Sequence, residues 1–551
     1  MVSPTILKRA VTSLLRLAYG ATVAFVLWMV LGHYVPGQGL TALLFIGDKP
    51  VAHAIAPLQE YRPYTYPDSS GYDGQYYAQL AMNPDLGDPD LRLAIDNLPF
   101  RARRMLISWT CWALAGGDPE RALHLYCLAN IVCWLALALL LLRWFPPDHW
   151  QNYLRWAGVM LAFGLIYSVR GSLLDGPSLL VIAAAVALKE REHSWWAAVA
   201  LGAAGLIRES NIVAAVILLP LGCREWKVWR RALLQGLIVA APILLWTAYL
   251  LVLFPPAAQG GARAIDWPFV SFAHRWGTAL AQSLATGREP YNDRNLLCLF
   301  ALTLQAGILL ARIRPKDHWW RLGASMLALM AVLGPAVWEG YPISATRVLL
   351  PLALAFNILV PRHWKWLPVL LLGNLSVLCS FPVLDFTLST KVCYTVEGAE
   401  RVRTDRAGPA PQWVVRFDDN WFPAERSALQ YWRWAGGDAR IDIVNPLPVP
   451  VRATVRFGLK SRGSRFLAVS DCRIPLWRGT IGDTLTQVEL ASVTLAPGPN
   501  DWLFTATPST PAKRSPSDRG VVFSVRDLEI EILGPATAGP PPPPPGATTA
   551  P

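Results

Sequence analysis

The first two thirds of the chain consist of long apolar runs separated by short polar segments. Apolar runs of this kind predict membrane-spanning helices, although several of these are shorter than the roughly 20 residues that a full crossing needs. We expect eleven spans, at 13–34, 121–142, 154–168, 173–188, 195–207, 211–222, 232–254, 295–312, 320–337, 345–360 and 366–384. The pair 195–207 and 211–222 is also compatible with a single re-entrant hairpin, which would leave the sidedness of the later spans unchanged.

After residue 385 the long apolar runs are replaced by short stretches in which apolar and polar residues alternate. Residues 451–460 show this alternation, which predicts a strand with one buried face. Similar runs occur at 412–418, 439–444, 486–495, 501–506 and 521–532, separated by turn residues. The chain is therefore predicted to fold as an α-helical polytopic membrane domain (1–385) followed by an all-β sandwich (386–535). The proline-rich end, 536–551, cannot build a core and is predicted to be a disordered tail.

Composition supports a membrane protein, because 53% of the residues are hydrophobic and only 16% are charged, against about 25% in an ordinary soluble domain. The formal net charge of +12 does not indicate nucleic-acid binding, since much of the basic charge sits in short loops between apolar runs. This is the positive-inside pattern. It places the N-terminus in the cytoplasm, with the first span retained as a signal anchor, and the chain after residue 385 on the opposite side.

The first outer loop, 35–120, contains the stretch Gly71-Tyr72-Asp73-Gly74-Gln75-Tyr76-Tyr77. Tyr76, Tyr77, Leu80 and Ala81 recur at helical spacing, which predicts a short amphipathic helix lying flat on the bilayer with Asp73 at its N-terminus. The two glycines would let the backbone approach a substrate closely. The alternative is that Asp73 only caps the helix.

The remaining ionisable residues of the outer side point to phosphate chemistry. Arg101, Arg103 and Arg104 stand outside, against the charge rule, and guanidinium groups suit phosphate oxygens. Binding of anionic lipid headgroups, or pairing with the acidic residues at 85–96, would also account for them. Charges near a membrane are costly and by default mark function, although ion pairing alone remains an alternative. The others on this side are Arg170, Asp175, Arg208, Glu209, Glu339 and Arg347.

The cysteines and aromatic residues add two predictions about the outer domain. Cys393 and Cys472 are its two cysteines, and we predict that they form a disulfide in an oxidising compartment. The other six lie in or next to apolar segments, and the sequence has no CxxC, HExxH, P-loop or GxGxxG motif. The residues Trp421, Glu425, Tyr431, Trp432 and Trp434 would either stack on sugar rings or belong to the core.

A carboxylate and several arginines at a membrane surface suit sugar transfer from a lipid phosphate. A general base would deprotonate an acceptor hydroxyl, and the arginines would stabilise the phosphate leaving group. Over about residues 10–385, the chain resembles the GT-C superfamily of multispanning glycosyltransferases. The resemblance rests on the order and common sidedness of Asp73-Gly74-Gln75-Tyr76-Tyr77, Arg101 to Arg104, Asp175-Gly176-Pro177 and Arg208-Glu209.

The resemblance implies a polyprenyl-phosphate donor of a hexose or pentose and an acceptor that is a glycan, a lipid or a protein. It implies a site on the extracytoplasmic face of a bacterial inner membrane, with the β-sandwich in the periplasm. Asp73 would be the catalytic base, and the substrate-binding residues would be Tyr72, Gln75, Arg101, Arg104, Arg170, Asp175, Arg208, Glu209, Glu339 and Arg347. A second acidic residue of the loop would be Asp68, Asp85 or Asp88. Members of the superfamily differ in metal dependence, so the resemblance leaves open whether this protein uses Mg²⁺ or Mn²⁺.

Two other classes of protein remain open. A flippase or transporter for lipid-linked sugars would place its polar groups at the bilayer midplane, in interrupted helices. A non-catalytic protein of envelope assembly would not need Asp73.

Overall fold

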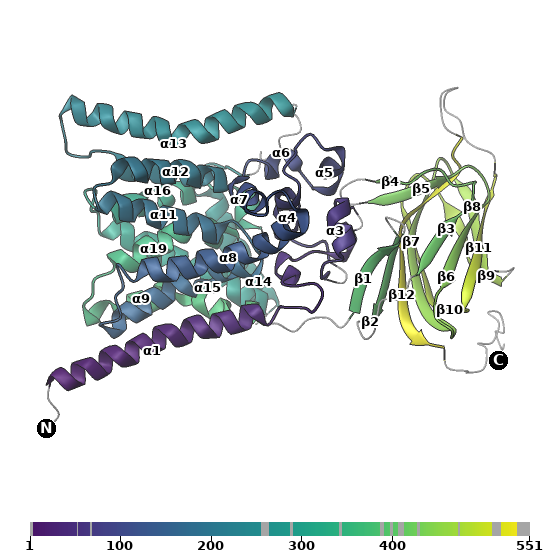
Figure 1. The fold of residues 1–551 in the computed structure, drawn as a ribbon, viewed down its shortest axis with the longest axis horizontal. Coiled ribbons are helices and arrows are strands. Elements are labelled where there is room, and N and C mark those ends of the chain that lie inside the picture. Colours follow the sequence, from purple (N-terminus) through teal and green to yellow (C-terminus); the bar gives the residue numbers. More distant parts are fainter. Residues whose placement is uncertain are drawn as a thin grey trace. The chain divides into compact units, whose positions relative to one another are not determined.

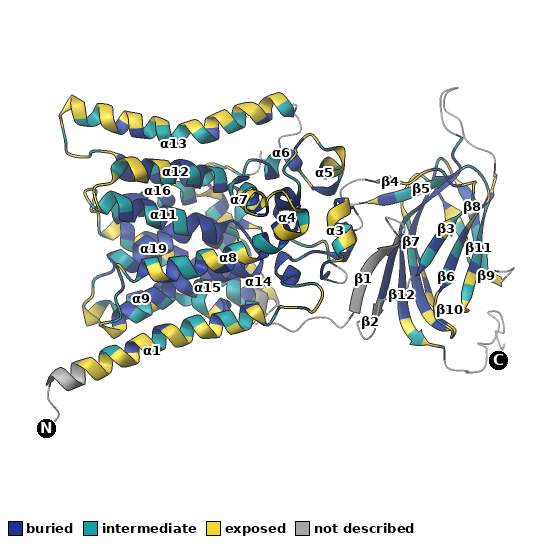
Figure 2. Cartoon of the chain, in the orientation of Figure 1, coloured by how far each residue is buried: buried dark blue, intermediate teal, exposed yellow. Residues whose placement is uncertain are grey.

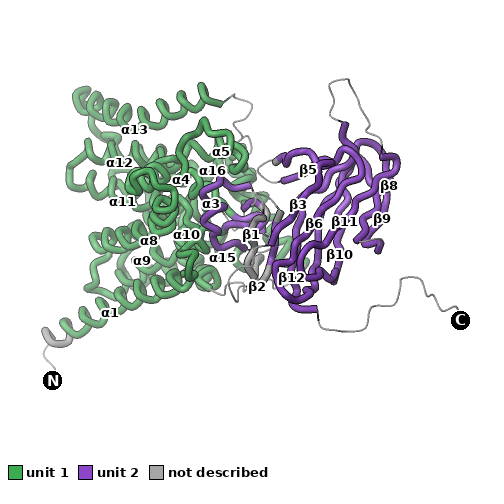
Figure 3. Tube along the Cα trace, turned by 45° about the vertical axis from the view of Figure 1, so that its right-hand side comes forward, with its two compact units in different colours: residues 1–45, 72–388 green, residues 46–71, 389–551 purple. Residues whose placement is uncertain are grey.

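The chain forms two compact units, which Figure 3 shows in different colours: residues 1–45 with 72–388, and residues 46–71 with 389–551. The computed structural model describes residues 4–51, 53–66, 69–254, 264–286, 290–340, 344–385, 391–396, 400–405, 413–426, 430–471, 474–509 and 520–536. The first unit is helical, and the second contains the strands. A helical domain followed by an all-β domain is thus confirmed.

The helical unit contains helices of very different lengths (Figure 1). The α-helices are α1 (Pro4–Leu31), α4 (Gly74–Met82), α5 (Pro89–Ala94), α6 (Leu98–Arg101), α7 (Leu106–Leu114), α8 (Pro119–Leu141), α9 (Trp150–Met160), α10 (Phe163–Arg170), α11 (Asp175–Glu190), α12 (Ser194–Ile207), α13 (Trp226–Leu253), α14 (Val270–Thr286), α15 (Pro290–Ala311), α16 (His318–Val332), α17 (Pro335–Trp338), α18 (Ser344–Val348), α19 (Leu350–Leu359) and α20 (Leu367–Gly373). The short 3₁₀ helices are η1 (Thr41–Leu44), η2 (Glu209–Leu218), η4 (Trp364–Trp366), η5 (Leu375–Cys379) and η6 (Phe381–Val383).

Four helices within the described residues are long and apolar enough to cross a membrane: Arg9–Leu31 of α1, α8, α13, and Asn292–Ala311 of α15. The bent pair Trp364–Gly373 and Leu375–Val383 would make a fifth. Figure 2 shows much of α1 and α13 exposed, whereas α11 is largely buried. The exposed side chains of α13 include Leu244, Leu245 and Val252. Exposed apolar surface of this kind suits lipid rather than water, and the protein is a multi-pass membrane protein.

Several of the other predicted spans are divided into shorter helices. The span 154–168 is divided between α9 and α10, 320–337 between α16 and α17, and 345–360 between α18 and α19. Prolines stand in the first turn of α17 and of α19, where their missing N–H costs least. Near the end of α19 the buried Arg155 donates to the carbonyl oxygens of Asn357 and Val360, at 2.5 and 2.8 Å. The total of eleven spans remains a prediction.

The β unit is a sandwich of a seven-stranded and a five-stranded sheet. The larger sheet has the order β1-β2-β12-β5-β4, with β7 paired to β12 and to β10, and the smaller has the order β3-β6-β11-β8-β9. The strands are β1 (Lys391–Val396), β2 (Glu400–Asp405), β3 (Val414–Phe417), β4 (Glu425–Arg426), β5 (Tyr431–Ala435), β6 (Ala439–Asn445), β7 (Val451–Ser461), β8 (Arg465–Asp471), β9 (Ile474–Ile481), β10 (Thr486–Leu495), β11 (Gly498–Thr507) and β12 (Phe523–Pro535).

The two sheets share one apolar core, to which residues such as Phe504 of the smaller sheet and Val455 of the larger belong. Trp421 packs in this core against Phe504 and Phe523, so the core interpretation holds for this residue. The side chain of Tyr431 is buried as well. Trp432 is half-buried on β5 and donates to Glu425 at 3.0 Å, and Trp434 on the same strand is also half-buried.

Residues 46–71, which belong to the predicted first outer loop, group with the β unit. This segment includes α2 (Asp48–Val51) and α3 (Ala56–Tyr61). Asp48 is fully buried and forms an ion pair with Arg403 of β2. Arg401 and Arg403 in turn pair with Glu529 of β12, at 3.0 and 3.1 Å. A buried ionic cluster therefore holds the segment that precedes Tyr72 and Asp73 in the chain.

Two further predictions involve residues that lie outside the described part of the chain. Cys472 lies outside the described residues, so its disulfide with Cys393 of β1 stays a prediction. Residues 537–551 of the predicted tail lie outside them too.

Candidate active site

The position of Asp73 is set by a close approach of backbone segments at the residue that follows it. A Cβ atom on Gly74 would lie 2.3 Å from the carbonyl oxygen of Gly171 and 2.9 Å from that of Leu44. No side chain fits at such distances from backbone atoms, so the position requires glycine. The glycine serves packing within the protein, rather than the approach of a substrate that the sequence suggested.

The helix that follows, α4, is buried on all sides, with α7 and α8 packed against it. Gln75 and Gln79, which would belong to the polar face of a surface helix, are 2% and 3% exposed. The Gln79 amide donates to the Gln75 carbonyl at 3.3 Å, which satisfies part of its polarity internally. The prediction of a helix lying on the bilayer is therefore wrong, because tertiary packing covers both faces.

Asp73 occupies the N-cap position of α4, yet its side chain makes no capping hydrogen bond. Instead it forms an ion pair with Arg101, at 3.0 Å, and remains 28% exposed. Arg101 also holds Asp96 through two hydrogen bonds of 3.0 and 2.8 Å. Burial alone would raise the pKa of Asp73, but the positive charges of Arg101, Arg347 and Arg104 outweigh it and lower this pKa. Asp73 is thus an ionised carboxylate that an arginine, not the helix end, holds in place.

A second ion pair lies beside the first. Arg104 donates to Glu209 at 2.8 Å and to the Tyr77 hydroxyl at 3.2 Å. Its guanidinium carbon lies 4.7 Å from the centre of the Phe100 ring. Burial opposes the charge of Arg104, but Tyr77 and Glu209 keep its pKa above the ordinary value. These hydrogen bonds join α4 to the start of η2.

A third group of charges centres on Asp175, whose side chain is 2% exposed. Asp175 pairs with Arg208 and, at 3.4 Å, with Arg347. Arg347 also donates to the Tyr72 hydroxyl at 2.6 Å and to Ser344 at 2.9 Å. Because two arginines share one carboxylate here, an entering anion would neutralise positive charge that Asp175 alone leaves in excess.

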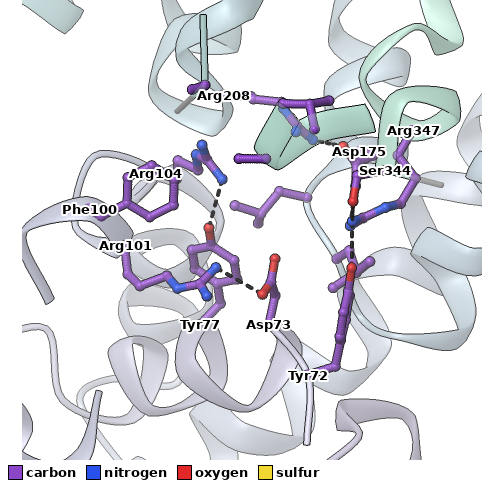
Figure 4. A pocket seen from close by; sticks show the side chains of 15 residues that line it. Tyr72, Asp73, Tyr77, Phe100, Arg101, Arg104, Asp175, Arg208, Ser344 and Arg347 are labelled. Carbon is purple, nitrogen blue, oxygen red and sulfur yellow. Dashed lines mark hydrogen bonds and ion pairs between the residues drawn. The ribbon is translucent and has the colours of Figure 1, made fainter. Parts of the chain in front are cut away.

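The three groups line one cavity of about 340 Å³. Figure 4 shows Asp73 beside Arg101, with Asp175 and Arg347 across the cavity. The lining comprises Tyr72, Asp73, Tyr77, Phe100, Arg101, Arg104, Leu173, Leu174, Asp175, Arg208, Ala264, Ala336, Val337, Ser344 and Arg347.

The residues that line this cavity carry an excess of positive charge. Its lining contains four guanidinium groups and two carboxylates. Two further carboxylates, Asp96 and Glu209, pair with Arg101 and Arg104 without belonging to the lining. Two of the four carboxylates that pair with these arginines thus lie outside the lining, which leaves the lining itself with an excess of positive charge. Such an arrangement suits an anionic ligand such as a phosphate.

Four of the predicted site residues are not part of the lining. Gln75 is buried within α4. Arg170 donates to the Ala42 carbonyl at 3.0 Å, and its guanidinium carbon lies 4.2 Å from the centre of the Phe45 ring. Glu339 is exposed beside His274, at 4.0 Å. Glu209 pairs with Arg104, which lines the cavity. The predicted residues that do line it are Tyr72, Asp73, Arg101, Arg104, Asp175, Arg208 and Arg347.

The candidates for a second acidic residue of the loop have local roles. Asp85 accepts from the backbone of Gly87, and Asp88 caps α5 by accepting from the backbone of Asp90. Asp68 lies outside the described residues. Another carboxylate of this loop, Asp96, pairs with Arg101, as Asp73 does.

Several lining residues were not predicted from the sequence, among them Tyr77, Phe100 and Ser344. Tyr77 stands one helical turn after Asp73, and Ser344 one turn before Arg347, so helical spacing from the predicted residues would have found both. Phe100 directly precedes Arg101. The aliphatic lining residues have no comparable signal in the sequence.

The carboxylates of the cavity do not fit a divalent cation. Asp73 is engaged by Arg101, and Asp175 by Arg208 and Arg347. Within the described residues there is no group of three or more His, Cys, Asp or Glu side chains that could hold a metal ion. We therefore assign no step to Mg²⁺ or Mn²⁺.

Comparison with known proteins gives a weak structural similarity. The sequence matches no protein-family model and no curated protein. Among solved structures, it is similar to the arabinosyltransferase EmbB from Mycobacterium smegmatis, with 11% sequence identity and a TM-score of 0.29. The similarity covers 92% of this chain and 64% of the arabinosyltransferase chain, so this protein spans less than two thirds of that enzyme. The cavity, rather than this similarity, is the basis of the functional proposal.

Proposed function

We propose that the protein is an integral membrane glycosyltransferase that transfers a sugar from a polyprenyl-phosphate donor to a glycan, lipid or protein acceptor. The observation that supports this proposal is the cavity in which an ionised Asp73 faces four arginines. The motifs around these residues resemble those of the GT-C superfamily, which adds the class of donor. The proposal places the site on the extracytoplasmic face of a bacterial inner membrane, with the N-terminus in the cytoplasm and the β-sandwich in the periplasm.

In the proposed reaction, the acceptor hydroxyl attacks the anomeric carbon of the donor sugar. The bond between that carbon and the phosphate oxygen breaks, and polyprenyl phosphate leaves. Asp73 takes the proton of the hydroxyl, and the arginines of the cavity stabilise the negative charge that develops on the phosphate. A single displacement of this kind inverts the configuration at the anomeric carbon.

The arginines also link donor binding to the basicity of Asp73. In the free protein their charges lower its pKa, which keeps the carboxylate ionised but makes it a weak base. A donor phosphate would neutralise part of that positive charge and raise the pKa of Asp73. The carboxylate would then become a better proton acceptor only when the donor is in place.

Asp175 serves a positioning role in this proposal. It is buried and paired with both Arg208 and Arg347, so it fixes their guanidinium groups at the cavity. Tyr72 supports Arg347 from a different side, through its hydroxyl. Asp73, by contrast, pairs with Arg101 and is the more exposed of the two carboxylates.

The experiment that tests the function is substitution of Asp73 by Asn in a deletion strain. Asn keeps the shape and would cap a helix nearly as well, but it cannot accept the proton. General-base catalysis contributes about 10²–10⁴ in rate, so transfer should fall by that order at normal expression. The measurement is mass spectrometry of envelope glycans and of accumulated lipid-linked sugars, with wild-type complementation as the control. Near-normal glycans in Asp73→Asn would remove this residue from the mechanism.

A transport function is the second candidate, and the interrupted helices α9–α10 and α18–α19 favour it. Against it, Asp73, Asp175 and Arg208 belong to segments that the charge pattern of the sequence predicts on the outer side, whereas a transporter would hold such groups near the bilayer midplane. Proteoliposomes distinguish the two candidates, because a transporter moves a lipid-linked sugar between leaflets without an acceptor, whereas an enzyme produces a glycosylated acceptor.

A further inference from the structure

Two buried thiols lie together behind the wall of the cavity. Cys298 of α15 and Cys379 of η5 are separated by 81 residues in the sequence, and their sulfur atoms are 3.9 Å apart. Their exposed fractions are 0% and 1%. Proximity across this separation is a property of the fold, because α15 and η5 pack directly against each other.

We propose that Cys298 and Cys379 form a structural disulfide in the mature protein. The two sulfur atoms must approach from 3.9 Å to the roughly 2.05 Å of a disulfide bond. Rotation about the Cα–Cβ bonds moves the two sulfur atoms relative to each other and is the shortest route to this distance. The pair is thus placed for a bond that the sequence pattern of the spans did not suggest.

In the sequence, both cysteines lie near span ends that face an oxidising compartment in the proposed orientation. Cys298 lies near the start of the span predicted at 295–312, and Cys379 lies near the end of the span predicted at 366–384. Both ends fall on the outer side in the proposed orientation, on which this inference therefore depends. Disulfides form and persist on that side of a membrane.

The chemistry requires an oxidant, which we take to be a disulfide-bearing thiol oxidoreductase of the extracytoplasmic side. The thiolate of one cysteine attacks the disulfide of the oxidant and forms a mixed disulfide. The thiolate of the second cysteine then displaces the oxidant, which leaves as a dithiol. The chain loses two protons and two electrons, and the oxidant gains them. Since both sulfurs are buried in the folded protein, the exchange takes place before α15 and η5 have closed on each other.

The bond would stabilise one wall of the candidate active site. Cys298 and Cys379 belong to an apolar cluster with Tyr167, against which Tyr72 packs. The rings of Tyr72 and Tyr167 meet edge to face, at 5.7 Å between their centres. The Tyr72 hydroxyl in turn accepts a hydrogen bond from Arg347 in the cavity. A covalent link between α15 and η5 would therefore hold the layer behind Tyr72 and Arg347.

The test counts alkylated thiols in the intact, full-length protein. Membranes are treated with N-ethylmaleimide under denaturing conditions without reductant, and the protein is then weighed by mass spectrometry. In Cys298→Ser or Cys379→Ser, one cysteine is removed and its bridged partner is released, so each variant should gain one label relative to wild type. The control Cys133→Ser, a half-buried cysteine of α8, should lose one label.

Peptide mapping of the unreduced wild-type protein gives the second readout. The expected result is one cross-linked peptide pair that contains Cys298 and Cys379, lighter by two hydrogen atoms than the two thiol peptides together. Loss of a label in both serine variants would overturn the proposal, as would a bridge from either cysteine to a different partner. Neither readout depends on enzymatic activity or on a correctly folded variant, so failure here is distinct from failure of the proposed function.

Discussion

The most specific prediction of the proposed function concerns Arg101. Its guanidinium group binds Asp96 through Nε and Nη2 and Asp73 through Nη1, at 3.0 Å. The Nη1 atom carries a second hydrogen, which the proposed function directs to a phosphate oxygen of the donor. Lysine would preserve the positive charge, but its single ammonium nitrogen cannot reproduce this planar fork. Arg101→Lys therefore separates the geometry of the guanidinium group from its charge.

The expected loss of activity in Arg101→Lys can be calculated from the loss of a single hydrogen bond between Arg101 and the donor phosphate. A hydrogen bond to a charged group contributes about 1.5–3 kcal/mol, and about 1.4 kcal/mol corresponds to a factor of ten. Without this bond in the transition state, kcat/KM should fall by roughly 10- to 100-fold. The apparent affinity for the donor should weaken at the same time.

The assay measures initial rates in proteoliposomes against the concentration of the lipid-linked sugar that accumulates in the deletion strain. Rates are normalised to the amount of inserted protein. Arg103→Lys is the matched control, because Arg103 is a neighbouring cation that does not line the cavity. Its kinetics should remain near wild type. If Arg101→Lys also shows wild-type kinetics, the arginines act as generic surface charge and the phosphate-binding role is refuted.

The pH dependence of the reaction, the glycine at the start of α4 and the orientation of the chain can each be tested as well. The arginines lower the pKa of Asp73 below its ordinary value of 3.8, so the acid limb of kcat/KM in the wild type should have its midpoint below pH 3.8. Arg101→Gln removes the largest of the three positive charges that lower this pKa, and the acid limb should then appear at higher pH than in the wild type. Gly74→Ala places a Cβ atom 2.3 Å from the Gly171 carbonyl oxygen and should destabilise the helical unit by about 3 kcal/mol in thermal unfolding. Gly20→Ala, with no atom within 4 Å of the added Cβ, should have little effect, and equal melting temperatures for the two variants would contradict the packing argument. A reporter fused at residue 400 should be active as an extracytoplasmic alkaline phosphatase, because the basic loops of the helical domain predict that the β unit lies outside. Activity confined to a cytoplasmic reporter at that residue would overturn the assigned sidedness, and with it the compartment argument for Cys298 and Cys379.

Local patterns in the sequence were sufficient for the class of each domain. The runs that form α1, α8, α13 and α15 are long and apolar, and a run of this length has few alternatives to a membrane helix. Alternation likewise identified β7 and β10, because apolar residues recur at every second position in a strand with one buried face. The strands β1, β2, β4, β5, β8 and β9 were not predicted.

The same local patterns misjudged elements whose surroundings are supplied by distant parts of the chain. The spacing of Tyr76, Tyr77 and Leu80 correctly indicated a helix, but only the packing of α7 and α8 decided that both of its faces are buried. The segment 46–71 has no compositional break from the rest of its loop. Its place in the β unit depends on the pairing of Asp48 with Arg403, 355 residues later.

For the site, the sequence predicted a set of charges on one side of the membrane, and tertiary structure decided which of them meet. Asp73 and Arg101 share one loop, so their proximity could be expected from the sequence, whereas Asp175 and Arg347 are 172 residues apart. Arg170 and Glu339 have the same local signal as the residues that line the cavity, yet they lie elsewhere. A buried charge requires a partner, and this requirement can be read from the sequence. The choice of partner depends on where the backbone brings helix ends together, and no local pattern of residues encodes that.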